Sequence, residues 1–172
     1  IVAFYPCIYF CEINSCAFTF WYKNYRSLSD LEKIQKILKR SEKRTEFYER
    51  LIKFVAICLI KKIRMIFENP YSNMSFLINN FLDKPKIIDK NRMERGDFYV
   101  KPTAYWFWNC EPTHGFTEQN NKKQKIIEKT KSAPQEGICS EERSLISPDY
   151  ARNWICDFVL GKSQPEIDPC LF

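Results

Sequence analysis

Two short apolar runs, each followed by a proline, flank one long amphipathic stretch of the chain. The first run, residues 1–5, leads into Pro6-Cys7, and the second, residues 63–67, leads into Glu68-Asn69-Pro70. Short apolar runs that end at such residues predict buried β-strands. A strand, a crossover helix and a second strand close almost always in the right-handed sense with the strands parallel. The pattern therefore predicts a mainly parallel α/β sheet in which these two strands are neighbours.

The stretch between the two runs predicts helix. Ser29 and Glu32 have the spacing of a capping box, which marks a helix start. Apolar side chains then recur at alternating steps of four and three along residues 34–59, which predicts one face packed on the sheet. The polar residues Ser41 and Thr45 interrupt this face and predict a bend between two helices.

The rest of the chain predicts two more strands and a last helix. Residues 86–89 and 104–109 have strand patterns, and Ser147-Pro148-Asp149 predicts a helix start, with the helix reaching Leu160. Residues 111–142 are polar and predict a mobile loop. The 172 residues fit one domain: residues 1–110 form the sheet and its crossover helices, and residues 143–172 form a docking helix and a tail.

The two predicted strand ends carry side chains that can take part in catalysis. Cys7 and Glu68 follow the two predicted strands. Ligands bind to parallel sheets outside the carboxyl ends of the strands. A thiol and a carboxyl group are therefore expected at one rim of the sheet.

These two sequences resemble the motifs of the cytosine-5 DNA methyltransferases, in which a Pro-Cys follows the fourth strand and a Glu-Asn follows the fifth. Tyr5 and Pro70 stand where that family usually has Pro and Val. A third passage, with a strand, a loop and then Lys101-Pro102-Thr103 before the next strand, is similar to one found late in phage-type members. The resemblance covers roughly residues 1–110.

The resemblance implies a partial Rossmann-like methyltransferase fold, with S-adenosylmethionine as cofactor and DNA as partner. It implies that Cys7 adds to carbon 6 of cytosine, so that carbon 5 can take up a methyl group, and that Glu68 contacts ring nitrogen N3. Arg92 and Arg95 are the nearest analogues of the arginines that hold the base, although their spacing departs from the family pattern. The residues expected to bind substrate or shape the site are Pro6, Asn69, Pro70, Lys101 and Thr103.

The cofactor-binding residues cannot be assigned from this sequence. The family places a glycine-rich loop after its first strand, and none of the four glycines here lies in a Gly-x-Gly cluster. We therefore expect a fragment that lacks the first three strands and is inactive alone. Residues 111–142 number only 32, too few for the family's target-recognition domain. Sequence specificity is thus expected to be low or to come from another protein.

Charge and composition leave some choices open. Residues 30–64 hold eleven Lys or Arg and five Asp or Glu, and this difference of +6 equals the net charge of the chain. Such a basic helix face either contacts DNA phosphates or is a solvated surface. The cysteine spacing Cys7-x3-Cys11-x4-Cys16 fits no usual metal site, so we expect reduced cysteines and no metal. A mean hydropathy of −0.42 argues against an integral membrane protein. Reduced cysteines favour the cytoplasm, and the resemblance to phage-type methyltransferases implies a bacterial or phage-infected cell.

Two other functions stay open. Tyr5-Pro6 resembles part of the Pro-Pro-Tyr loop of amino-methyltransferases, although amino transfer needs no thiol such as Cys7. The chain is otherwise a non-catalytic remnant of a methyltransferase fold, or a DNA-binding partner that keeps this fold.

Overall fold

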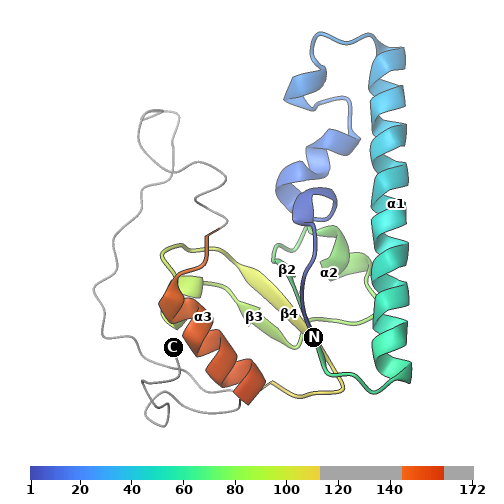
Figure 1. Cartoon of the computed structure of the whole chain (residues 1–172). Coiled ribbons are helices and arrows are strands. Elements are labelled where there is room, and N and C mark those ends of the chain that lie inside the picture. Colours follow the sequence, from blue (N-terminus) through green and yellow to red (C-terminus); the bar gives the residue numbers. More distant parts are fainter. Residues whose placement is uncertain (113–144, 161–172) are drawn as a thin grey trace. The chain divides into compact units, whose positions relative to one another are not determined.

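The computed structural model of the chain describes residues 1–112 and 145–160, and these residues form two compact units (Figure 1). The first unit comprises residues 1–88 and 103–110 and contains most of the sheet. Of the described residues, the second comprises 89–102, 111–112 and 145–160. Residues 89–102, which the sequence grouped with the sheet, thus belong to the second unit. The predicted mobile loop lies almost entirely outside the described residues.

The sheet has four strands in the order β1-β2-β4-β3. Strand β1 (Val2–Phe4) pairs parallel with β2 (Met65–Pro70), with Phe4 opposite Glu68. This pairing confirms the predicted neighbours and the α/β class. Strand β4 (Thr103–Trp108) pairs antiparallel with β2, and β3 (Ile87–Asp89) lies beyond it. The sheet is therefore mixed and not mainly parallel, because β4 returns beside β2 in the opposite direction.

The crossover is one continuous helix, α1 (Asp30–Ile60). The predicted capping box is confirmed: Ser29 accepts from the Glu32 backbone N–H, and the Glu32 carboxylate accepts from the Ser29 backbone N–H at 2.8 Å. The predicted bend is wrong, since the helix runs through Ser41 and Thr45 without a break. The polar pair needs no bend, because this part of α1 does not pack on the sheet.

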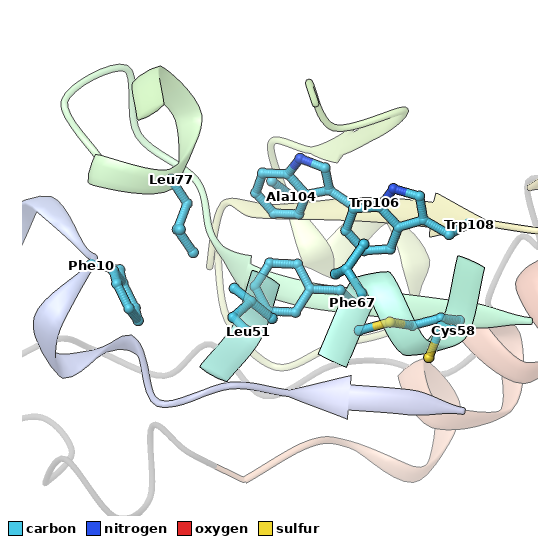
Figure 2. Close-up of a cluster of buried hydrophobic side chains, with 10 residues drawn as sticks. Phe10, Leu51, Cys58, Phe67, Leu77, Ala104, Trp106 and Trp108 are labelled. Carbon is cyan, nitrogen blue, oxygen red and sulfur yellow. The ribbon is translucent and has the colours of Figure 1, made fainter. Parts of the chain in front are cut away.

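Only the second half of α1 covers the sheet. Leu51 and Cys58 are fully buried and meet Phe67 of β2 in the core (Figure 2). In the first half, Ile34 and Leu38 are 43% and 57% exposed. A 31-residue helix is about 46 Å long, whereas a six-residue strand spans about 20 Å. The predicted apolar face of α1 therefore packs on the sheet only along the part of the helix that lies over the strands.

The segment between β1 and α1 consists of three short 3-10 helices, Cys7–Tyr9, Glu12–Phe18 and Lys23–Tyr25. The short helix α2 (Phe76–Asn80) follows β2, and its Phe76 N–H donates to the Phe10 carbonyl oxygen at 2.8 Å. Phe10 itself is buried in the core of the first unit (Figure 2).

The second unit is built around α3 (Pro148–Ile155), which continues as a π-helical segment, Cys156–Leu160. Ser147 caps α3 by accepting from the Tyr150 backbone N–H at 3.0 Å, which confirms the predicted start. The 3-10 helix Arg92–Arg95 packs against α3, where the Asn153 side chain donates to the Arg95 carbonyl oxygen at 2.8 Å.

Candidate active site

Cys7 lies just beyond the carboxyl end of β1. It is exposed and begins the 3-10 helix that follows Pro6. Its carbonyl oxygen accepts from the backbone N–H groups of Phe10 and Cys11, both at 2.9 Å. The thiol therefore sits on a tight hydrogen-bonded turn outside the strand.

Glu68 lies inside β2, which continues to Pro70, so it does not follow the strand as the sequence suggested. It is half-buried and is paired with Phe4 on one side and Tyr105 on the other. Because successive side chains of a strand alternate between faces, Glu68 lies on the face opposite Phe67 and α1. The register places Cys7 three residues beyond the partner of Glu68. That the two side chains share one pocket stays a prediction.

The side chain of Asn69 joins the two strand ends. It is only 1% exposed, and its Nδ2 donates to the Tyr5 carbonyl oxygen at 3.4 Å. The Tyr5 hydroxyl in turn donates to the Phe47 carbonyl oxygen of α1 at 2.6 Å. Burial raises the pKa of the Tyr5 phenol, so it keeps its proton as a donor. The peptide before Pro6-Cys7 is thus held from both β2 and α1.

The segment after Cys7 is held in the same way. Arg40 of α1 donates to the Ile8 carbonyl oxygen at 2.9 Å, and the Ser72 hydroxyl donates to the Glu12 carboxylate. These anchors were not found in the sequence, since no local pattern relates Arg40 to a loop some thirty residues earlier. The one sequence feature that could have indicated these anchors is the high aromatic content of the loop. Arg40 of α1 lies over two of its rings.

Thr103 stands opposite Pro70 in the β2–β4 pair and is fully buried. Pro70 is two residues after Glu68 in the same strand, so Glu68, Pro70 and Thr103 lie on one face of the sheet. Lys101 belongs to the second unit and is half-buried.

Arg95 also belongs to the second unit and is 6% exposed. It donates to the Asp89 carboxylate through Nε at 2.9 Å and Nη2 at 3.0 Å, and to Asp157 through Nη1. Burial disfavours the Arg95 charge, but the hydrogen bonds and charge of Asp89 and the charge of Asp157 outweigh it, so the pKa of Arg95 is raised. The Arg95 guanidinium therefore lies between two carboxylates of its own unit.

Arg92 is 2% exposed and has a comparable setting. Its Nη2 lies 2.6 Å from an Asp97 oxygen, and its guanidinium lies 4.1 Å from the centre of the Tyr150 ring. Both arginines are therefore bound to groups of their own unit. The predicted place of Arg92 and Arg95 on the wall of a base pocket stays a prediction.

The described residues do not fit a cofactor cradle. Among the described residues there is one glycine, Gly96. It has φ +108° at the end of the 3-10 helix that carries Arg92. A Cβ there would lie 3.0 Å from backbone atoms of Asp149 and Tyr150. Gly96 therefore allows two backbone segments to approach closely. It does not directly follow a β-strand, as a glycine of a nucleoside-binding loop would. We assign no described residue to S-adenosylmethionine.

Within residues 1–112 and 145–160, no three His, Cys, Asp or Glu side chains gather as metal ligands. The helices in this part of the chain are too short or too polar to cross a bilayer. Comparison of the chain with protein-family models, with curated proteins and with solved structures found no match.

Proposed function

We propose that this chain is part of a DNA cytosine-5 methyltransferase of Rossmann-like fold, with Cys7 as the nucleophile. The main support is the parallel pairing of β1 with β2, because Pro6-Cys7 follows β1 and Glu68-Asn69 lies in β2. The Asn69 contact to the Tyr5 carbonyl oxygen adds to this, because it ties one sequence to the other. The resemblance of both sequences to the family motifs supplies the chemistry.

Cytosine carbon 5 is a poor nucleophile, and addition of a thiolate at carbon 6 overcomes this. The Cys7 sulfur forms a bond to carbon 6, and the electrons of the 5,6 double bond move toward carbon 5 and the ring. Glu68 acts at N3, where it donates a hydrogen bond or proton and stabilises the charge that builds up there. After carbon 5 carries the methyl group, a base such as a water molecule takes the carbon 5 proton, the 5,6 double bond forms again and the Cys7 sulfur leaves as a thiolate. S-adenosylmethionine would supply the methyl group, and no described residue is assigned to its binding.

The site must act on a base outside the duplex stack. A cytosine in a duplex is stacked on both faces, so its carbon 6 is reached only after the nucleotide swings out of the helix. The exposed position of Cys7, beyond the strand end and outside the core, suits a substrate that arrives from solvent. DNA is therefore the expected partner.

A covalent trap tests the nucleophile without the methyl donor. Duplex DNA carrying 5-azacytosine has a carbon 6 that is more electrophilic than that of cytosine, so a thiolate can add to it directly. We expect an adduct that resists denaturation and maps to Cys7 by peptide mass spectrometry. Cys7→Ala should abolish it. Cys16→Ala is the matched control and should form it, because Cys16 is also exposed and lies in the same segment.

The same assay tests Glu68. Glu68→Gln should slow adduct formation by roughly 10²–10⁴, the usual contribution of a general acid, while the far-UV circular dichroism spectrum is unchanged. An adduct at Cys11 or Cys16 would show that the nucleophile is another thiol. DNA binding with no adduct at any cysteine would favour the DNA-binding partner over the enzyme.

A further inference from the structure

The first half of α1 extends beyond the carboxyl ends of β1 and β2 (Figure 1). The last turn of the helix lies at the amino end of β2, where the Asn109 side chain donates to the carbonyl oxygens of Cys58 and Ile63, both at 2.9 Å. From there the helix passes the sheet, and no residue of α1 before Phe47 belongs to the core of this unit. Its first four turns therefore stand on the same side as Cys7 and the loop that follows it.

The six basic residues of α1 from Lys36 to Arg50 divide into two sets. Arg40 and Arg44 point inward: the Arg40 guanidinium lies 5.3 Å from the ring centres of Tyr9 and Phe18, and that of Arg44 lies 4.0 Å from Phe18. Burial and the nearby charge of Arg40 lower the pKa of Arg44. These two half-buried arginines hold the loop after Cys7 against the helix.

The second set forms an outward stripe. Its members are exposed, are spaced by three, four and seven residues, and fall within an arc of about 60° at roughly 100° per residue. They are Lys36, Lys39, Lys43 and Arg50, which we call the α1 stripe. Glu46 lies beside the stripe and pairs with Lys43 at 2.7 Å and with Arg50.

We propose that the α1 stripe binds the phosphate backbone of the DNA on which Cys7 acts. This inference rests on the proposed function, since it is the position of Cys7 that makes this end of the unit the DNA side. The stripe is about 21 Å long, which matches about six base pairs of duplex at 3.4 Å each. Its charge is opposite to that of the backbone, and contacts between lysines and phosphates supply much of the affinity of DNA-binding proteins.

The α1 stripe could also hold the DNA in place of a target-recognition domain. Only 39 residues, 109–147, lie between β4 and α3, where a recognition domain would be inserted. Contacts to phosphates position a protein on DNA without reading its sequence. A basic helix beside the site thus holds the duplex in place, and sequence preference is left to other contacts.

The experiment measures binding of the whole chain to a fluorescein-labelled duplex of arbitrary sequence, by anisotropy over a series of salt concentrations. The test variant is Lys36→Gln/Lys39→Gln/Lys43→Gln. The control is Lys61→Gln/Lys62→Asn/Arg64→Gln, which removes the same charge from exposed residues at the other end of α1. Asn is chosen at position 62 because the backbone there is left-handed, with φ 53°.

We expect the test variant to bind at least about tenfold more weakly at low salt, and the slope of log affinity against log salt to fall by about three, one for each lost contact. The control should keep the wild-type slope. Circular dichroism should show equal helicity in all three proteins, since the changed side chains are exposed.

Equal losses in the two variants would overturn the proposal, because they would report net charge and not the stripe. Absence of duplex binding by the wild-type chain would overturn it as well. Neither result depends on the nucleophile. If the test variant binds the duplex with the wild-type affinity and salt slope while the Cys7 adduct with 5-azacytosine still forms, the proposed function stands while the stripe does not.

Discussion

The side-chain amide of Asn69 donates to the carbonyl oxygen of Tyr5 across 3.4 Å. It connects the residue after Glu68 with the residue before Pro6-Cys7, although 64 positions separate them in the chain. The amide is buried, and its Oδ1 has no hydrogen-bond partner among the described residues. Burying a polar side chain that makes only one long hydrogen bond reduces the stability of the fold. Its position between the two strand ends gives a reason for its presence there.

Replacing Asn69 by Ala should lower the free energy of unfolding by about 1 kcal/mol, since the Tyr5 carbonyl oxygen loses a donor while the unpartnered Oδ1 disappears with the side chain. Urea denaturation followed by circular dichroism measures the change. Asn24→Ala is the control, because it removes an exposed hydrogen bond, to Tyr22 at 3.1 Å, and should cost less than about 0.5 kcal/mol. Equal costs for the two variants would show that the Asn69 contact does not support the strand ends.

The division of α1 into a packed half and a projecting half can be tested with two leucines of one helix. Leu51 is fully buried against the sheet and Leu38 is 57% exposed. Leu51→Ala should lower the free energy of unfolding by about 2–5 kcal/mol through lost contacts and a cavity. Leu38→Ala should change it by less than about 0.5 kcal/mol, because alanine also favours helix. A large cost at Leu38 in chemical denaturation would mean that the projecting half is covered by other parts of the protein.

The parts of this fold that follow from local patterns could be predicted from the sequence. The start of α1 at Ser29 and that of α3 at Ser147 rest on side chains that satisfy the first N–H groups of a helix, which is a property of a few neighbouring residues. The parallel pairing of β1 and β2 followed from the length of the helix between them. These predictions needed no knowledge of distant contacts.

The antiparallel course of β4 and the partners of Arg92 and Arg95 could not be predicted in this way. The direction of β4 depends on the path of residues 71–102, which contains no long helix to set a crossover. Arg95 pairs with Asp157, 62 residues later, and nothing in the local sequence separates such an arginine from an exposed one. The sequence placed Cys7 and Glu68 on neighbouring strands, but the extension of β2 to Pro70 is set by pairing with Thr103.

The capping box of α1 predicts a dependence on pH. Hydrogen bonds from the Ser29 side chain and backbone lower the pKa of Glu32 in the folded chain. A carboxyl group whose pKa is lowered by folding stabilises the fold above its unfolded pKa, and this contribution is lost as the pH falls through the folded value. Glu32→Gln should therefore be less stable than the wild type near neutral pH, and the difference should shrink in acid. Thermal unfolding at a series of pH values measures this.

The control for the capping box is Ser27→Ala, which changes an exposed serine that is not the cap. Ser29→Ala should cost about 1 kcal/mol, the typical value for loss of an N-cap side chain, whereas Ser27→Ala should be nearly neutral. A stability difference between Glu32→Gln and the wild type that stays constant down to low pH would contradict the assigned role of the Glu32 carboxylate.

The two carboxylates around Arg95 make this position sensitive to substitution. Arg95→Met would leave Asp89 and Asp157 without the guanidinium between them, and breaking a buried ion pair from one side costs about 3–5 kcal/mol. Arg95→Lys should recover only part of this, since an ammonium group cannot donate to both carboxylates with the same fork geometry. Arg152→Met, at an exposed position of α3, should have little effect on thermal unfolding.

The same variants separate a structural role of Arg95 from a role at the base. If Arg95 serves mainly to hold the second unit together, Arg95→Lys should lower the melting temperature in parallel with the loss of any adduct formation at Cys7. If it contacts the base, Arg95→Lys should keep its melting temperature and lose the adduct. The buried pairing with Asp89 and Asp157 leads us to expect the first result. An intact melting temperature in both Arg95→Lys and Arg95→Met would contradict it, because a guanidinium that held these two carboxylates in place could not be removed without cost.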